Sequence, residues 1–468
     1  MNREVVYLVT TANYDIVVVG GGIAGYSAAI RLAQRGRKVA LIEERFLGGE
    51  CTNYGCVPSK ALYRIAESIK GLKRFCRSPP TISWPDTVSW VKNIVDNLRN
   101  GIKYLVDRYG VELYTDHAIV TPKGVKLADS GEHLDSREII VATGTIPRPL
   151  PQTPFDGRHV LSNREIFYLK QQPSSLVIVG GGAIGVEIAH IFALLGTEVY
   201  LVEAQPRILP MCDPDVSRAI KTHLSDLGVK IRTSTTVNKI EVRSRVEEAE
   251  VTLSTGDKLR AEKVLVAIGR TPRTEDLFQG VDVRLSKGFI EVGDGLRTSA
   301  PRIRAVGDVA GPPLLAHKAL LEGLVAAESI ASGKDLPRPE PKAIPFTIFS
   351  GLEVSFLGYT EEELRSMGVK YKRYRLPLGF LPSSMIKGGE RSFVKILTRE
   401  ENPEEVLGIH MVAPNASEVI SAFIPLYLRK LRLADVARIP YPHMTVSEAL
   451  REVAEYILGE PIHVFARR

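Results

Sequence analysis

GGGIAGYSAAIRLAQRGRKVALIEE, residues 20–44, and GGGAIGVEIAHIFALLGTEVYLVEA, residues 180–204, decide the fold of this chain. The first stretch follows a β-branched run, 16–19, that predicts a buried parallel strand, and the second stretch follows a similar run. A glycine turn, a helix and a second strand come next in both, so each copy is a βαβ unit. The stretches 139–148 and 264–273 also match each other. The sequence therefore predicts two related α/β domains.

The glycine spacing of the first copy suits a dinucleotide. Gly20 permits a tight turn, Gly22 lets the backbone approach a pyrophosphate, and Gly25 packs the helix against the strand. The N-terminus of the helix offers free N–H groups to phosphates, and Glu43 can accept hydrogen bonds from a ribose diol. Because strand, helix and acid accompany the glycines twice, we expect both copies to bind dinucleotides. The alternative is a duplicated fold whose second copy is empty.

The second copy places the same groups at Gly180, Gly182, Gly185 and Glu203. The Glu203 carboxylate suits a free ribose 2′-hydroxyl and would repel a 2′-phosphate, which favours NAD over NADP. Arg207 lies close enough in sequence to leave NADP open.

A cysteine pair follows the first copy in GGECTNYGCVPSK, residues 48–60. Pro58 suits the first turn of a helix, so Cys56 lies at a helix N-terminus, where the dipole favours its thiolate. Lys60 adds a cation one turn later. A zinc site would need a second ligand pair, and no CxxC or HxxxH exists among the 9 His and 4 Cys, so we expect no metal site. A structural disulfide is the other alternative, but the pattern favours a redox-active pair of Cys51 and Cys56.

Bulk properties indicate an ordinary globular protein. A length of 468 residues exceeds one hydrophobic core and predicts three domains of about 150 residues. The net charge of +7 comes from basic residues scattered among acids, so we expect no nucleic-acid or membrane partner, whereas an acidic partner protein stays open. Met1 to Tyr14 lacks the pattern of a secretory signal, and the apolar runs fall far short of the ~20 residues that span a bilayer. We therefore expect a soluble cytoplasmic protein.

The segment GGECTNYGCVPSKAL, residues 48–62, resembles the active-site segment of the pyridine nucleotide-disulfide oxidoreductases, and the similarity spans nearly the whole chain. The resemblance implies FAD at the first glycine motif, NAD at the second, and an Asp308 that holds the ribityl chain. It also implies that Glu187 pairs with Lys60 beside the flavin. The remaining residues that it places at the cofactors are Gly49, Ala118, Gly144, Leu315, Ala316, His317, Val237 and Gly269.

Two further segments refine the resemblance. LLAHKA, residues 314–319, is similar to dihydrolipoamide dehydrogenases rather than to glutathione or mercuric reductases. HMTVSE, residues 443–448, resembles the family's His-Pro-Thr-x-x-Glu motif, which implies that His443 is the acid–base group and that Glu448 orients it. Met444 and Leu352 depart from the pattern, since each stands where the family has proline.

Together these features predict an α/β protein with two Rossmann-like domains and an α+β dimerisation domain that has an antiparallel sheet. We expect a homodimer in which His443 reaches the partner subunit's Cys51. The activity implied is oxidation of protein-bound or free dihydrolipoamide by the Cys51–Cys56 disulfide, with electrons passing through FAD to NAD+. Reduction of another disulfide or of an electrophilic metal ion is one alternative, and a non-catalytic flavoprotein subunit is another. The expected domain bounds are 1–150 and 273–338 for FAD, 151–272 for NAD, and 339–468 for the dimerisation domain.

Overall fold

The computed structural model describes residues 13–73, 75–78, 80–243 and 247–465. The chain divides into two compact units, unit 1 (1–57, 92–146 and 270–339) and unit 2 (58–91, 147–269 and 340–468). Most of the Met1 to Tyr14 segment, and with it the expectation about a secretory signal, lies outside the described residues. Among the helices of the described residues, none has both the length and the apolar character needed to cross a membrane.

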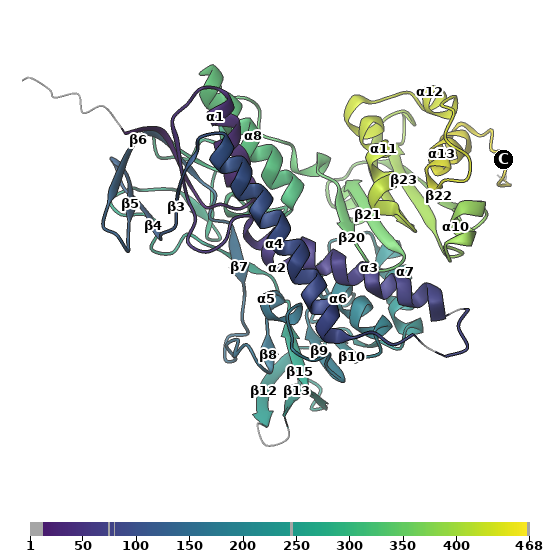
Figure 1. The fold of residues 1–468 in the computed structure, drawn as a ribbon. Coiled ribbons are helices and arrows are strands. Elements are labelled where there is room, and N and C mark those ends of the chain that lie inside the picture. Colours follow the sequence, from purple (N-terminus) through teal and green to yellow (C-terminus); the bar gives the residue numbers. More distant parts are fainter. Residues whose placement is uncertain (1–12, 74, 79, 244–246, 466–468) are drawn as a thin grey trace, which may run out of the picture. The chain divides into compact units, whose positions relative to one another are not determined.

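Unit 1 is built on a parallel sheet in the order β3-β2-β1-β6-β19. Helices α1 and α8 lie side by side (Figure 1), and the absence of a side chain at Gly323 permits this, because a Cβ there would lie 2.4 Å from the Ala24 carbonyl oxygen. The start of β6 also pairs antiparallel with β5, which pairs with β4. The elements are β1 (Tyr14–Val19), α1 (Ile23–Gln34), β2 (Val39–Ile42), β3 (Glu112–Tyr114), β4 (Ala118–Val120), β5 (Gly124–Leu127), β6 (His133–Val141), β19 (Ile303–Ala305) and α8 (Ala316–Ser332).

Unit 2 contains a second parallel sheet in the order β11-β10-β9-β15-β8. An antiparallel meander, β12-β13-β14, adjoins it and buries one face against the same core. The elements are β8 (Val160–Leu161), β9 (Ser175–Val179), α6 (Ala183–Leu194), β10 (Glu198–Val202), α7 (Pro214–Asp226), β11 (Lys230–Arg232), β12 (Val237–Arg243), β13 (Glu248–Leu253), β14 (Lys258–Ala261) and β15 (Lys263–Val266).

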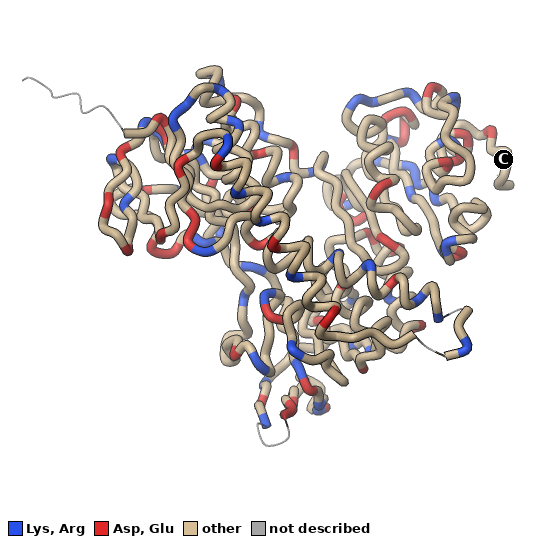
Figure 2. The backbone as a smooth tube through the Cα atoms, viewed as in Figure 1, with Lys and Arg blue, Asp and Glu red and all other residues tan. Residues whose placement is uncertain are grey.

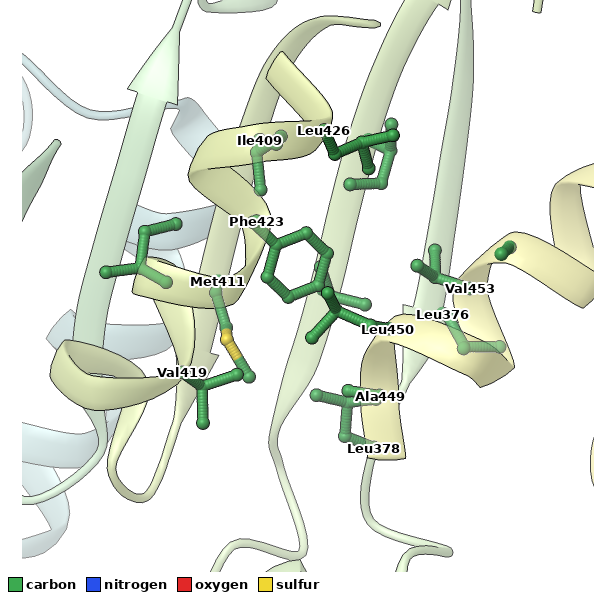
Figure 3. Close-up of a cluster of buried hydrophobic side chains, with 14 of the residues drawn as sticks. Leu376, Leu378, Ile409, Met411, Val419, Phe423, Leu426, Ala449, Leu450 and Val453 are labelled. Atoms are coloured by element: carbon green, nitrogen blue, oxygen red, sulfur yellow. The ribbon is translucent and has the colours of Figure 1, made fainter. Parts of the chain in front are cut away.

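The C-terminal part of unit 2 is an antiparallel sheet in the order β20-β21-β24-β23-β22. Phe423 of α11 and Leu450 of α13 pack with Met411 of β24 in one buried cluster (Figure 3). The elements are β20 (Phe346–Ile348), β21 (Glu353–Gly358), α9 (Glu361–Ser366), β22 (Tyr371–Pro377), β23 (Phe393–Arg399), β24 (Val406–Ala413), α11 (Ala416–Arg429) and α13 (Ala449–Leu458). The predicted fold class, two Rossmann-like α/β domains and an α+β domain with an antiparallel sheet, is confirmed.

Acidic and basic residues alternate along both units (Figure 2). The 61 Lys and Arg residues are thus interspersed with the 54 Asp and Glu residues, and the positive net charge is spread rather than concentrated. Because both signs occur throughout each unit, the positive net charge does not by itself mark a binding surface.

Candidate active site

The first glycine turn, between β1 and α1, has the shape that a pyrophosphate needs. Gly20 has a φ of 105°, and a Cβ there would lie 2.4 Å from the Ala142 carbonyl oxygen. At Gly25 a Cβ would lie 1.8 Å from the Gly20 carbonyl oxygen, so helix and strand touch through backbone alone. At Gly22 the nearest atom is 3.9 Å away, and no side chain caps the α1 N-terminus that begins there. The open middle glycine and the uncapped N–H groups therefore fit a phosphate.

Glu43 lies against the same turn. Its Oε2 accepts a hydrogen bond from the Gly21 N–H at 2.8 Å, and its Oε1 accepts one from the Arg45 N–H at 2.9 Å. Burial raises the pKa of Glu43 above its usual value, although these two backbone hydrogen bonds act in the opposite direction. The carboxylate is thus fixed at the end of β2, where its remaining lone pairs can accept from a ribose diol.

The second turn in unit 2 repeats this geometry down to individual hydrogen bonds. Gly180 has a φ of 111°, and a Cβ at Gly185 would lie 1.9 Å from the Gly180 carbonyl oxygen. The nearest atom to a Cβ at Gly182, the Met211 Cε, is 3.9 Å away, and α6 begins there without a side-chain cap. Glu203 accepts hydrogen bonds from the Gly181 N–H at 2.6 Å and the Gln205 N–H at 2.7 Å. Both copies therefore fit a dinucleotide by the same backbone contacts.

Cys51 and Cys56 form a disulfide, with their Cα atoms 4.7 Å apart. Cys51 lies in the short helix α2 (Gly49–Tyr54), and Cys56 is the first residue of α3 (Cys56–Lys73). Gly49 has a φ of 57°, and a Cβ there would lie 2.8 Å from the Gly22 Cα. The helix that carries Cys51 therefore begins in contact with the first glycine turn.

A chain of hydrogen bonds links the redox helix to Asp308. Asp308, in the 3-10 helix η2 (Gly307–Ala310), accepts from the Thr145 hydroxyl at 2.9 Å. Arg270 donates to that hydroxyl at 2.7 Å and to the Thr145 carbonyl oxygen at 2.8 Å. Arg270 also forms a 2.7 Å ion pair with Glu50, the neighbour of Cys51. The predicted ribityl-binding residue and the disulfide are thus parts of one network.

A buried ion pair supports the Asp308 loop from α8. Lys318 donates to the carbonyl oxygens of Gly307 at 3.0 Å and Gly311 at 2.6 Å, while Glu322 accepts from the Gly307 N–H at 2.8 Å. Burial lowers the pKa of Lys318 and raises that of Glu322, and their mutual attraction across 3.1 Å opposes both shifts. The pair therefore holds the η2 backbone from two sides.

The remaining residues predicted at FAD lie at ends of elements in unit 1. Leu315 is the N-cap of α8, and Ala316 and His317 form its first turn, with no side-chain cap. Ala118 is the buried first residue of β4, and Gly144 has a φ of 68° with nothing within 4 Å of a Cβ. An uncapped helix end and an open glycine are compatible with a nearby ligand, and their role in FAD binding stays a prediction.

Lys60 and Glu187 form the predicted ion pair in unit 2, with Nζ and Oε2 2.7 Å apart. Glu187 also accepts from the Ser59 hydroxyl at 3.2 Å and from the Phe349 N–H at 3.1 Å. The Lys60 ammonium lies 4.4 Å from the centroid of the Phe349 ring, in cation–π geometry. Helix α3, which begins at Cys56, is therefore held to α6, which begins at the second glycine turn.

Two more predicted contacts of NAD lie in unit 2. Val237 is the half-buried first residue of β12. Gly269 has a φ of 118°, and a Cβ there would meet nothing within 4 Å. Their role at the nucleotide stays a prediction.

His443 is 75% exposed in its side chain, and its Nδ1 lies 3.1 Å from Glu448 Oε1. Glu448 is buried and its Oε2 accepts from the Thr445 N–H at 3.2 Å, so the carboxylate that orients the imidazole is itself fixed. Met444 has a φ of 20°, which proline, with φ near −65°, could not adopt. With methionine in place of proline at position 444, the backbone after His443 therefore adopts a turn that proline could not. The hydrogen bond from the Thr445 N–H still holds Glu448 beside His443.

Sequence analysis missed the residues that link the cysteine pair to Asp308 and the residue that packs on Lys60. Arg270 binds Thr145 across 125 positions of sequence and Glu50 across 220. The only sequence signal was that Thr145 and Arg270 each directly follow the glycine of one of the two repeated stretches. Phe349 gave no signal at all.

Comparison with known proteins agrees with this geometry. Residues 14–323 match the family model described as pyridine nucleotide-disulphide oxidoreductase, and residues 344–454 match the model of its dimerisation domain. A dihydrolipoyl dehydrogenase of Thermus scotoductus is 35% identical over 464 residues, which cover 97% of this chain and 99% of the relative. A dihydrolipoyl dehydrogenase of Bacillus subtilis is 32% identical and covers 96% of this chain and 99% of its own.

Solved structures give the same picture. LpdA from Mycobacterium tuberculosis superimposes with a TM-score of 0.87 at 25% identity, covering 94% of this chain and 99% of that one. The Cu(II) complex of the HOCl-induced flavoprotein disulfide reductase RclA from Escherichia coli has a TM-score of 0.85 at 26% identity, covering 95% and 100%.

Proposed function

Because the chain belongs to the pyridine nucleotide-disulphide oxidoreductase family, we propose that it is an FAD-dependent dihydrolipoyl dehydrogenase with NAD+ as acceptor. The observation that carries the proposal is the Cys51–Cys56 disulfide, whose Cys51 lies in a helix, α2, that begins in contact with the first glycine turn. The dihydrolipoyl dehydrogenases of Thermus scotoductus and Bacillus subtilis, similar over their whole length, support the choice of dihydrolipoamide as substrate.

The two βαβ units divide the cofactors between them. FAD binds at the first turn through Gly20, Gly22, Gly25 and Glu43, with Asp308 on its ribityl chain. NAD binds at the second turn through Gly180, Gly182, Gly185 and Glu203. When bound, FAD supplies two-electron transfer between a dithiol and a nicotinamide. The fit rests on the uncapped α1 and α6 N-termini and on the open space at Gly22 and Gly182.

The protein's own groups carry out the thiol chemistry. His443 takes a proton from one substrate thiol, and the thiolate attacks the Cys51 sulfur, breaking the Cys51–Cys56 bond and releasing Cys56 as a thiolate. The second substrate thiol then attacks the substrate sulfur of this mixed disulfide, and the released Cys51 sulfur takes up that thiol's proton. The substrate is oxidised to its cyclic disulfide, and the cysteine pair is left reduced for reoxidation.

The exposed position of His443 supports a homodimeric active site. A base must approach the sulfur whose attack it promotes, and a side chain that is 75% exposed in one chain is free to reach another chain. We place His443 opposite the partner subunit's Cys51, with Glu448 holding the imidazole. The dimerisation-domain match over residues 344–454, which include His443, agrees with a dimer. We propose the cytoplasm as the compartment, where thiol substrates stay reduced.

The deciding test is anaerobic turnover of dihydrolipoamide with NAD+. We expect Cys51→Ser to lose this turnover while it keeps FAD, and we expect Cys76→Ser, which changes an exposed free thiol, to keep both. Dihydrolipoamide oxidation that survives in Cys51→Ser would refute the assigned role of the pair.

A second candidate is a reductase of another disulfide or of an electrophilic metal ion. It is favoured by the structural likeness to RclA, described as a disulfide reductase and solved as a Cu(II) complex, and by the turn at Met444 that differs from the family motif. Parallel rates with dihydrolipoamide, glutathione disulfide, Cu(II) and Hg(II) separate the two. A preference for any of the last three over dihydrolipoamide would establish the second candidate.

A further inference from the structure

Arg207 lies in a loop that covers the second glycine turn. The Leu209 N–H donates to the Gly181 carbonyl oxygen at 2.8 Å, and a Cβ at Gly181 would lie 3.0 Å from the Ile208 Cγ2. The same loop begins at Gln205, whose N–H holds the Glu203 carboxylate at 2.7 Å. The loop that carries Arg207 is therefore fixed by hydrogen bonds to the second glycine turn and to Glu203, the residue proposed to accept the ribose diol.

The guanidinium of Arg207 is already engaged from another part of unit 2. Its Nη1 donates to Glu362 Oε1 at 2.8 Å, and its Nη2 donates to Glu362 Oε2, a two-point contact. Nη2 also donates to the Pro210 carbonyl oxygen at 3.3 Å. The hydrogen bonds that Arg207 donates to Glu362 raise the pKa of Arg207. A guanidinium whose two terminal nitrogens both bind one carboxylate does not offer that pair of donors to a phosphate.

A buried cluster fixes Glu362 in this position. The Lys395 ammonium, 1% exposed, donates to Asp213 at 2.8 Å, to Asp215 at 2.9 Å, and to Glu361. Asp213 caps α7 directly after the loop, and Glu361 is the first residue of α9. The carboxylates of Asp213, Asp215 and Glu361, whose arrangement could hold a metal ion, thus surround an ammonium group. The cluster binds the start of α9 to the end of the nucleotide loop, and Glu362 follows one residue later.

We propose that Glu362, a residue of the C-terminal part of unit 2, is a specificity-determining residue that selects NAD over NADP by occupying Arg207. This inference rests on the proposed binding of NAD at Glu203. Glu203 repels a 2′-phosphate, and Glu362 withholds Arg207, a cation of the same loop that could compensate. Selection is thus divided between a local residue and a residue more than 150 positions away in sequence.

The test compares two probes that differ only in the 2′-phosphate, 5′-AMP and 2′,5′-ADP, titrated calorimetrically into the FAD-loaded enzyme. We expect Glu362→Gln to strengthen 2′,5′-ADP binding relative to 5′-AMP by about threefold to tenfold, the range of a partly exposed charge contact. High salt should reduce the gain. The double variant Glu362→Gln/Arg207→Gln should lose it, because the freed cation is gone.

The matched control is Asp226→Asn, which breaks the exposed Arg391–Asp226 ion pair between α7 and the segment before β23 and leaves Arg207 bound. Its binding ratio should equal that of the wild type. A ratio in Glu362→Gln within about twofold of the wild-type ratio would overturn the inference, as would a gain that persists in the double variant. Binding of 5′-AMP and 2′,5′-ADP involves no dithiol. A failure of this inference can therefore be distinguished from a failure of the proposed dihydrolipoamide activity.

Discussion

Replacement of Lys395 by Met should destabilise unit 2 strongly. The ammonium is the shared partner of Asp213, Asp215 and Glu361, whose ligand oxygens all lie within 4.8 Å of one another. At an effective dielectric of about 20, two charges at that distance repel by about 3 kcal/mol, so three bare carboxylates cannot all stay ionised. Partial protonation and the nearby arginines relieve part of the repulsion. We expect the variant's free energy of unfolding to be lower than that of the wild type by about 3–5 kcal/mol. The control Arg391→Gln breaks an exposed pair and should cost less than about 1 kcal/mol.

The two tryptophans make this measurement specific, because Trp84 and Trp90 both belong to unit 2. Denaturant unfolding followed by tryptophan fluorescence therefore reports on unit 2, and flavin fluorescence reports on unit 1. A loss below 1 kcal/mol, or no difference from Arg391→Gln, would refute the argument.

The same variant has a characteristic pH dependence. Burial alone raises the pKa of Glu361 and of Asp215, but hydrogen bonds from Lys395 bring both below their usual values. In the wild type, the stability that comes from these two ionised carboxylates is fully present above their pKa values in the unfolded chain. It is lost as the pH falls through their lower pKa values in the folded protein. In Lys395→Met the crowded carboxylates have raised pKa values, so the variant gains stability as the pH falls. The free-energy gap between the two proteins should narrow from pH 7 to pH 5, and an equal gap at both would contradict this.

Three further variants address the site. Gly20→Ala puts a Cβ 2.4 Å from the Ala142 carbonyl oxygen, so the purified variant should show no flavin absorbance. The matching variant of the second turn, Gly180→Ala, should keep flavin but have a KM for NAD+ that is raised by about tenfold or more. Arg270→Met removes the ion pair with Glu50 and the two hydrogen bonds to Thr145, so flavin should be released at lower urea concentrations than from the wild type, as followed by flavin fluorescence. His443→Gln should lower kcat for dihydrolipoamide by about 10²-fold to 10⁴-fold and leave NADH oxidation by an artificial acceptor unchanged, since that reaction needs no thiol base. Wild-type flavin retention in Gly20→Ala or Arg270→Met would contradict the expectation for that variant. So would an unchanged KM for NAD+ in Gly180→Ala or an unchanged kcat in His443→Gln.

The βαβ units could be predicted because their determinants are local. A glycine that touches a neighbouring backbone, such as Gly25 against Gly20, can be replaced by no other residue without a shift, so the requirement is visible in the sequence itself. The disulfide was predictable for a similar reason, since five positions and an intervening turn bring Cys51 and Cys56 together. The domain bounds stay a prediction, because the division into two units follows packing and cuts through α3 and α4 (Trp84–Arg108).

The connecting residues could not be predicted, because their partners are distant in sequence. Arg270 binds Glu50 across 220 positions, and Lys395 binds Asp213 across 182. Arg and Lys are ordinary surface residues in most sequences, so only the fold shows that these two are nearly buried. The family resemblance predicted the Lys60–Glu187 pair, but the ring of Phe349 that packs on Lys60 comes from the residue directly after β20.

The two nucleotide sites show how a duplicated unit acquires different properties. The local hydrogen bonds are the same in both copies, since Glu43 and Glu203 each accept from a glycine N–H and from the N–H two residues later. The difference lies in how a nearby arginine is neutralised. In unit 1 Arg273 pairs with Glu44, the residue directly after Glu43. In unit 2 the position that corresponds to Glu44 is Ala204, and the distant Glu362 pairs with Arg207 instead. A repeat read from sequence therefore predicts that a nucleotide binds, while the choice between nucleotides depends on contacts that only the folded chain supplies.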